Sequence, residues 1–144
     1  MSAAPGAREW TLAEAAAALR APTAADDKYA RGVVGLRTGS DLYPGAAVLG
    51  VEAAWRTGVG MVRYLGPARD LVLARRPETV TVPGRVQAWV IGSGTAERAA
   101  QERAALEELL AGSVPVVVDA GAGEQLLQRG ALLRGALGGA RSDD

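Results

Sequence analysis

A strand, a glycine-rich loop, a helix and a second strand follow one another in residues 33–67, VVGLRTGSDLYPGAAVLGVEAAWRTGVGMVRYLGP. The opening VVGL is typical of a buried strand, and the turn-forming TGSD soon after it ends that strand. Pro44 suits the first turn of a helix, and Gly58 is expected to follow its last turn. The result is a βαβ unit, and the loop after its first strand is where open α/β sheets bind ligands.

Composition bounds the classes of protein to consider. The 144 residues are 49% hydrophobic and 22% charged, which predicts one globular domain with one core. Sixteen basic and sixteen acidic residues give zero net charge, which argues against a nucleic-acid binder and leaves little repulsion against self-association. No apolar run approaches the ~20 residues of a membrane span, and no signal-peptide pattern opens the chain. We therefore expect a cytoplasmic protein without membrane contact.

The chain contains neither cysteine nor histidine. Disulfides, thiolate catalysis and cysteine-based zinc sites are therefore excluded. A Ser-His-Asp triad, a histidine general base and histidine metal ligands are excluded as well. The sequence therefore offers no metal ligands and no catalytic residue of these kinds.

Further elements lie on both sides of the central unit. A capping box at Thr11–Glu14 begins a short helix through Arg20, so residues 1–21 are expected to form an N-terminal helix ahead of the domain at 22–144. The two strands of the unit are predicted at 33–37 and 60–65. After the unit, the sequence predicts a helix within 68–77, an edge strand at 79–82 before Pro83, buried strands at 87–91 and 114–118, and a last helix at 124–137. These alternating elements predict an α/β fold, a three-layer α/β/α sandwich with a mostly parallel sheet.

The longest expected helix runs from Ala96 to Ala111, with Thr95 as its N-cap. Leu106, Leu109 and Leu110, with Ala99, are expected on its buried face. Two i,i+4 pairs, Arg98/Glu102 and Arg103/Glu107, are expected on its solvated face, where each contributes only tenths of a kcal/mol.

Small or acidic residues follow three of the predicted buried strands, at 38–41, 92–95 and 119–121. In a parallel sheet these strand ends meet at one edge, where glycines and helix N-termini can receive an anion. A nucleotide or pyrophosphate ligand fits this chemistry, although glycine-rich loops occur in any α/β protein. The GxxxxGK[ST] motif is absent, and Gly92-Ser-Gly94 lacks the third glycine of a dinucleotide fingerprint. Asp119 is either a functional carboxylate or an N-cap of the next helix.

Several motifs together resemble those of the ADP/ATP-dependent NAD(P)H-hydrate dehydratases, whose ribokinase-like domain is also called a carbohydrate-kinase domain. The match covers residues 26–121, and its YPGAA segment after Gly-Ser is the specific part. The matching segments are Lys28–Gly35 (KYARGVVG), Gly39-Ser40, Tyr43–Ala47 (YPGAA), Gly58–Val62 (GVGMV), Ile91–Gly94 (IGSG) and Val118–Ala120 (VDA).

The resemblance implies a lyase of metabolite repair that dehydrates hydrated NADH or NADPH at the expense of ADP or ATP with Mg. It also implies a dinucleotide-binding surface in this part of the domain. The substrate-binding residues that it suggests are Gly39, Ser40, Tyr43, Gly45, Ala46, Gly92, Gly94 and Asp119. Catalytic residues are not assigned.

Some parts of the family pattern are not found in this sequence. The T-P-H-P-x-E, K-G and G-S/T-G-D segments are absent, G-P-G-L-G becomes Gly92-Ser-Gly-Thr-Ala96, and D-A-D-A-L becomes Asp119-Ala-Gly-Ala-Gly123. We therefore expect the N-terminal half of an incomplete ribokinase-like domain, with weak or no turnover alone and an exposed strand edge that favours self-association. The alternatives are a non-catalytic remnant, a dinucleotide-binding α/β protein and a sugar-kinase relative.

Overall fold

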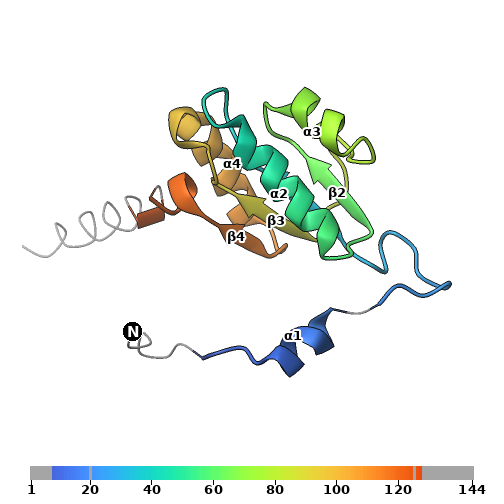
Figure 1. Cartoon of the computed structure of the whole chain (residues 1–144). Helices are drawn as coiled ribbons and strands as arrows, with labels where there is room; N and C mark the ends of the chain where they lie inside the picture. The colour runs from blue at the N-terminus through green and yellow to red at the C-terminus, as the bar shows by residue number, and fades with distance from the viewer. Residues whose placement is uncertain (1–7, 20, 125, 128–144) are drawn as a thin grey trace, which may run out of the picture.

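The computed structural model describes residues 8–19, 21–124 and 126–127 (Figure 1). Along the chain its elements are α1 (Leu12–Ala18), β1 (Val33–Arg37), α2 (Pro44–Arg56), β2 (Met61–Tyr64), α3 (Arg69–Arg75), β3 (Ala88–Ile91), the 3₁₀ turn η1 (Ala96–Arg98), α4 (Ala99–Ala111) and β4 (Val116–Val118). Residues 120–124 and 126–127 are also helical. No helix among the described residues is long and apolar enough to cross a membrane.

The four strands form one parallel sheet in the order β2-β1-β3-β4. All four strands predicted from buried apolar runs are present, and β4 begins at Val116, two residues later than expected. In the register, Leu36 of β1 lies between Tyr64 of β2 and Val90 of β3. The α/β class and the parallel sheet are thus confirmed.

Helices cover the two faces of this sheet unequally. On one face α2 packs over β1 and β2, and its core cluster comprises Leu36, Ala47, Val51, Val62, Tyr64 and Val72. On the other face α4 packs over β3, with Ile91, Leu106 and Ala122 buried together. Figure 1 shows α2 in front of the sheet and α4 behind it. Val117, which points to the α2 side of β4, stays 60% exposed, so the α2 face is open over β4.

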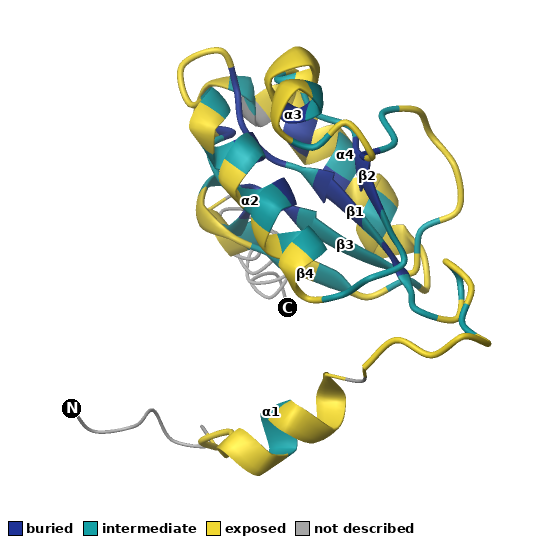
Figure 2. Ribbon diagram, turned by 45° about the vertical axis from the view of Figure 1, so that its right-hand side comes forward, coloured by how far each residue is buried: buried dark blue, intermediate teal, exposed yellow. Residues whose placement is uncertain are grey.

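The N-terminal helix α1 lies apart from the sheet in both Figure 1 and Figure 2. Its predicted capping box is confirmed, because Thr11 Oγ1 accepts the Glu14 N–H at 3.2 Å and the Glu14 carboxylate accepts the Thr11 N–H at 2.8 Å. The helix buries none of its residues, and Leu12 is 87% exposed. Local hydrogen bonds at the cap are therefore its main source of stability.

Several local predictions are wrong. The strand at 79–82 is reduced to one parallel bridge between Val80 and Arg63, because the chain turns away from β2 at Val82 and Pro83. The helix 96–111 is divided into η1 and α4, since Thr95 Oγ1 donates to the Gly92 carbonyl at 2.8 Å instead of capping α4. The last helix begins at residue 120, before the predicted 124, and its predicted part at 128–137 lies outside the described residues.

The assignment of α4 residues to faces is also partly wrong. Leu110 is 43% exposed, although Leu106 is buried as predicted. Glu102 is only 1% exposed, because Arg37 of β1 reaches across to it, so the Arg98/Glu102 pair does not lie on a solvated face.

Glu52 of α2 joins its own helix to the segment after α3. Arg76 donates to both carboxylate oxygens, at 2.6 and 2.8 Å, and Arg56 Nε donates at 2.8 Å. Hydrogen bonds from Arg76 first, then Arg56, lower the pKa of Glu52 from 4.5 to about 2. A carboxylate whose pKa is lower in the folded state stabilises the fold above its unfolded pKa and ceases to do so as the pH falls through its folded pKa.

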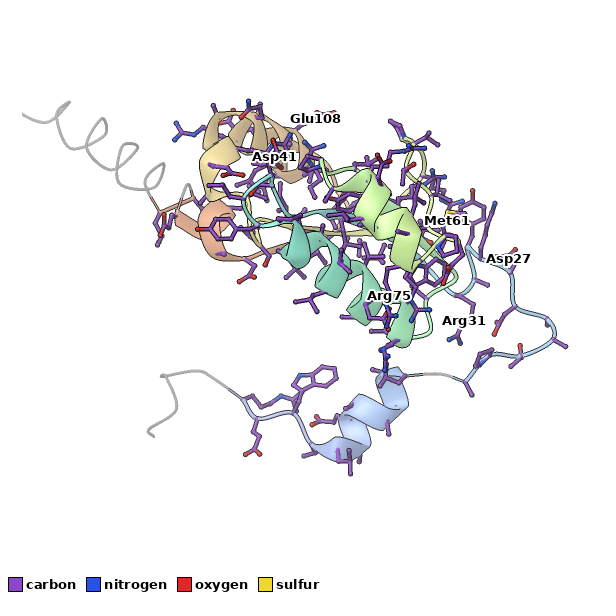
Figure 3. All side chains as sticks on the ribbon, turned by 45° about the horizontal axis from the view of Figure 1, so that its top comes forward. Asp27, Arg31, Asp41, Met61, Arg75 and Glu108 are labelled. Carbon is purple, nitrogen blue, oxygen red and sulfur yellow. The ribbon has the colours of Figure 1, made fainter. Side chains whose placement is uncertain are left out.

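We therefore expect the urea midpoint to fall as the pH is lowered from about 4.5 to about 2, and to fall less in Glu52→Gln. Equilibrium unfolding at half-unit pH steps measures both slopes. Glu108→Gln, at an exposed glutamate of α4 (Figure 3), is the matched control and should follow the unmodified chain. Equal slopes for all three proteins would contradict the role of Glu52.

Candidate functional site

The loops after β1, β3 and β4 meet at the carboxyl ends of these strands. The Gly39 N–H donates to the Ser93 carbonyl at 2.7 Å, and the Asp119 N–H donates to the Ile91 carbonyl at 2.9 Å. These bonds join each loop to its neighbour, so the convergence predicted from the sequence is present.

Two glycines allow this close packing. Gly92 has φ +116°, and a Cβ there would lie 1.9 Å from the Asp119 carbonyl oxygen. Gly94 has φ +70°, and a Cβ there would lie 2.6 Å from Cβ of Ala46. L-residues rarely adopt these backbone angles, and the space for a side chain is already filled. Both glycines are therefore needed for the packing of the loops.

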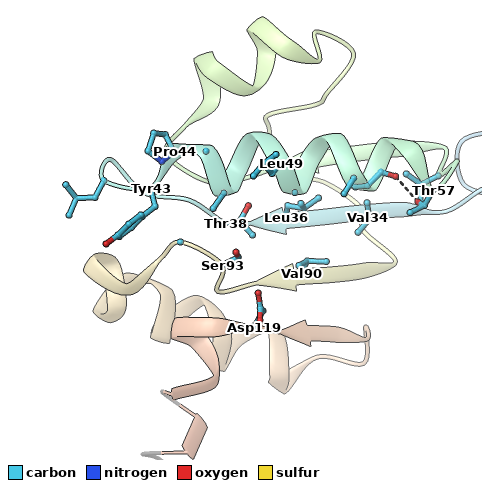
Figure 4. A pocket seen from close by; sticks show the side chains of 18 residues that line it. Val34, Leu36, Thr38, Tyr43, Pro44, Leu49, Thr57, Val90, Ser93 and Asp119 are labelled. Atoms are coloured by element: carbon cyan, nitrogen blue, oxygen red, sulfur yellow. Dashed lines mark hydrogen bonds between the residues drawn. The ribbon is translucent and has the colours of Figure 1, made fainter. Parts of the chain in front are cut away.

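A groove of about 1050 Å³ runs along α2 and ends at these loops (Figure 4). Its apolar part is lined by Val34 and Leu36 of β1, Val90 of β3, and Leu49 and Ala53 of α2. The polar side chains of Thr38, Ser93 and Asp119 also line it, each just after a different strand, as Figure 4 shows. The groove therefore suits a ligand with an apolar ring and polar groups at one end.

The predicted site residues occupy three places. Tyr43, Gly45, Ala46, Gly94 and Asp119 line the groove. Ser40 is fully buried and borders a second cavity, of about 490 Å³, beside Asp41 and Arg69. Gly39 and Gly92 are buried between the loops. The structure thus brings these residues together, and their binding role stays a prediction.

Thr38 and Ser93 line the groove from the segments 38–41 and 92–95, where the sequence predicted a ligand, whereas Leu49 lines it without having been predicted as a site residue. Side chains alternate between the two faces of a strand, so residues 34, 36 and 38 share a face of β1. The sequence therefore indicates that Thr38 lies on the same side as Val34 and Leu36. Leu49 is 71% exposed, and the helical pattern alone does not say which exposed leucines border a groove.

Tyr64 of β2 forms a hydrogen bond with the loop that follows β1, here called the β1 loop (residues 38–43). Its hydroxyl donates to the Thr38 carbonyl at 2.8 Å and accepts the Ala68 N–H at 3.1 Å. Burial raises the pKa of Tyr64, so the phenol stays protonated and keeps both bonds at neutral pH. The loops after β1 and β2 are therefore tied together under the candidate site.

Glu97 of η1 interacts with the same β1 loop. Its Oε1 accepts the Leu42 N–H at 2.9 Å. Hydrogen bonds from the Leu42 N–H and then the Ser40 hydroxyl lower the pKa of Glu97. A carboxylate is therefore bound by the loop after β1, next to Leu42, which lines the groove.

Thr38 and Thr95 form a matched pair of buried threonines at this site. Both are at most 2% exposed, but Thr95 Oγ1 donates to Gly92 while Thr38 Oγ1 has no hydrogen-bond partner. We expect Thr38→Val to leave the free energy of unfolding unchanged or raised, and Thr95→Val to lower it by about 1–3 kcal/mol. Urea unfolding of both variants measures this difference, and an equal loss in both would contradict it.

The described residues contain no group of three Asp, Glu, His or Cys side chains that could hold a metal ion.

Comparison with known proteins identifies similar sequences. The family model described as NAD(P)H-hydrate dehydratase matches residues 34–131. The bifunctional NAD(P)H-hydrate repair enzyme Nnr of Corynebacterium glutamicum is 50% identical over 116 residues, which cover 77% of this chain and 20% of that enzyme. The enzyme of the same name from Mycobacterium leprae is 47% identical over 113 residues, covering 75% and 24%. The chain thus spans about a fifth of the length of these curated relatives.

A solved structure shares the fold. The ADP/ATP-dependent NAD(P)H-hydrate dehydratase from Bacillus subtilis, co-crystallised with ATP/Mg2+, superposes with a TM-score of 0.68 at 28% identity. The superposition covers 83% of this chain and 48% of that protein. This part of the chain therefore shares the α/β fold of that dehydratase.

Proposed function

The chain belongs to the NAD(P)H-hydrate dehydratase family, and from this membership we propose that it forms the surface of a hydrate dehydratase that binds hydrated NADH or NADPH. The observation that carries the proposal is the groove along α2, which combines an apolar floor with polar side chains after three parallel strands. A hydrated nicotinamide dinucleotide has a ring, ribose hydroxyls and a pyrophosphate, and each matches one part of this groove.

The ring of the dinucleotide lies against the apolar side chains of Val90 and Leu49. The Asp119 carboxylate accepts hydrogen bonds from ribose hydroxyls. The pyrophosphate lies near Gly45, in the first turn of the 13-residue helix α2, where free N–H groups and the helix dipole favour an anion.

We also propose that ADP or ATP takes part in the reaction, as the name of the Bacillus subtilis relative states for that protein. The described residues contain no cluster of three metal-ligating side chains, so we assign no residue of this chain to Mg. In this proposal the described chain binds and orients the hydrated dinucleotide, and the adenine nucleotide drives loss of water from its ring.

Filling the groove tests the dinucleotide site. Ala53 is an exposed residue of α2 that lines the groove, so Ala53→Trp places a large side chain in the path of the ring. We expect NADH and NADPH hydrates to bind at least about tenfold more weakly, with the urea midpoint unchanged. Calorimetric titration measures the affinity, and turnover of hydrate with ADP separates an enzyme from a protein that only binds.

The matched control is Ala104→Trp, at an exposed position of α4 on the other side of the sheet, which should bind as the unmodified chain does. The proposal fails if the unmodified chain binds neither dinucleotide, or if Ala53→Trp binds both with unchanged affinity.

A further inference from the structure

The β1 loop contains an anion-binding arrangement that is already filled by a side chain of this protein. The Leu42 N–H donates to the Glu97 carboxylate at 2.9 Å, and the Ser40 hydroxyl helps to lower the pKa of this carboxylate. Ser40 Oγ in turn accepts the Tyr43 N–H at 3.1 Å, which fixes the hydroxyl in the loop. Ser40 is completely buried, so the donor is held by the fold.

The Glu97 side chain lies at the surface of the protein. It lies on the three-residue turn η1 and is exposed, so a rotation about its side-chain bonds can release the carboxylate into solvent. After such a release, the donors at Ser40 and Leu42 would need another acceptor, because unpaired donors are unfavourable.

The adjoining groove gives an independent sign of a ligand. Thr38 is 2% exposed and lines the groove together with Leu42, yet its hydroxyl has no partner. A buried hydroxyl without a partner is unfavourable, and a polar group of a ligand in the groove would satisfy it. Leu42 thus contributes both to the loop that binds the Glu97 carboxylate and to the lining of the groove.

We propose that Glu97 occupies a phosphate-binding subsite at the entrance to the groove, and that a phosphoryl group of a bound nucleotide takes its place. The proposal deepens the dinucleotide-binding function and rests on it. A carboxylate and a phosphate share the geometry of two oxygens facing N–H and O–H donors, and the phosphate has more acceptor oxygens and more negative charge.

The charges around the subsite are mixed. Arg98 lies next to Glu97 in η1 and favours an anion, and Arg69 borders the cavity that Ser40 lines. Asp41 and Asp70 border the same cavity and oppose an anion. Because these charges nearly balance, the hydrogen-bond donors decide the affinity, and Glu97 competes with the ligand for them.

A ligand can bind the subsite only in molecules where Glu97 has left it. The apparent association constant is therefore the intrinsic constant multiplied by the fraction of molecules in which the subsite is free. We expect Glu97→Ala to raise the affinity for inorganic pyrophosphate about tenfold, and Glu97→Gln to raise it less, since the amide oxygen still accepts the Leu42 N–H. Isothermal titration measures the affinity of pyrophosphate, NADH and ADP for each variant of the full chain. A gain for NADH alone assigns the subsite to the dinucleotide, and a gain for ADP alone assigns it to the adenine nucleotide.

Asp70→Asn is the matched control, because it removes one negative charge from the neighbouring cavity without freeing the donors. Ser40→Ala in the Glu97→Ala background should abolish the gain. Equal gains in Glu97→Ala and Asp70→Asn, no gain in Glu97→Ala, or no pyrophosphate binding by any variant would overturn the proposal. A gain for pyrophosphate while NADH binds to no variant would uphold the subsite and reject the dinucleotide-binding function.

Discussion

Gly92→Ala should lower the free energy of unfolding by at least about 3 kcal/mol, a large part of the stability of an ordinary domain. The added Cβ would lie 1.9 Å from the Asp119 carbonyl oxygen and 2.7 Å from Cβ of Ala122, and the residue has φ +116°. The nearest atom belongs to the backbone, so a rotamer change cannot relieve the contact. The loop after β3 must therefore separate from the end of β4.

Urea unfolding measures this loss, and Gly45→Ala is its control. Gly45 lies in the first turn of α2, where an added Cβ meets nothing within 4 Å, so its free energy of unfolding should change by less than about 0.5 kcal/mol. A Gly92→Ala protein as stable as the control would show that the loops after β3 and β4 do not need their close contact.

The elements that sequence reasoning predicted well are those with a strong local signal. The four strands are short, mostly apolar runs bounded by turn residues, and this pattern is typical of strands buried in a parallel sheet. The capping box at Thr11 and Glu14 depends only on residues three apart, so it could be predicted without knowledge of the tertiary structure.

The errors arise where distant residues decide the outcome. Residues 79–82 could pair with β2 along their whole length only if the chain continued straight past Val82. Local propensity does not encode the direction of the chain there, and only Val80 pairs, with Arg63. Thr95 has the residue type of an N-cap, but its hydroxyl bonds to Gly92 in the preceding turn. Residue type indicated a cap there, and tertiary packing selected another acceptor.

The position of the site could be predicted from the sequence, but the shape of the groove could not. The carboxyl ends of parallel strands must meet, so the convergence of the loops at residues 39, 92 and 119 followed from topology. The groove depends on which side of β3 and β4 is left open, and that is visible only from Val117 and Val90 in three dimensions. Self-association through the β4 edge stays a prediction.

Glu102 is the clearest case of a charge whose environment the sequence did not reveal. Its carboxylate is 1% exposed, and it accepts Arg37 Nε at 3.2 Å and lies 3.3 Å from Arg98 Nη1. Arg37 is the last residue of β1 and Arg98 precedes α4, so one carboxylate joins the sheet, η1 and α4.

Removing this carboxylate leaves two guanidinium groups side by side and half-buried, with side chains 23% and 29% exposed. We expect Glu102→Ala to lower the free energy of unfolding by about 3 kcal/mol, the lower end of the range for breaking a buried ion pair, because both arginines keep some contact with water. Glu102→Gln keeps the shape and one acceptor oxygen, so we expect roughly half of that loss.

The control Glu108→Ala removes an exposed glutamate from the same helix and should change the free energy of unfolding by less than about 0.5 kcal/mol. Urea unfolding at two salt concentrations separates the possible causes. Salt screens a surface pair strongly and a largely buried pair much less, so the loss in Glu102→Ala should change little between 0.05 M and 0.5 M NaCl. A loss that disappears at high salt, or one no larger than in Glu108→Ala, would show that the Arg37–Glu102–Arg98 cluster does not stabilise the packing of α4 on the sheet.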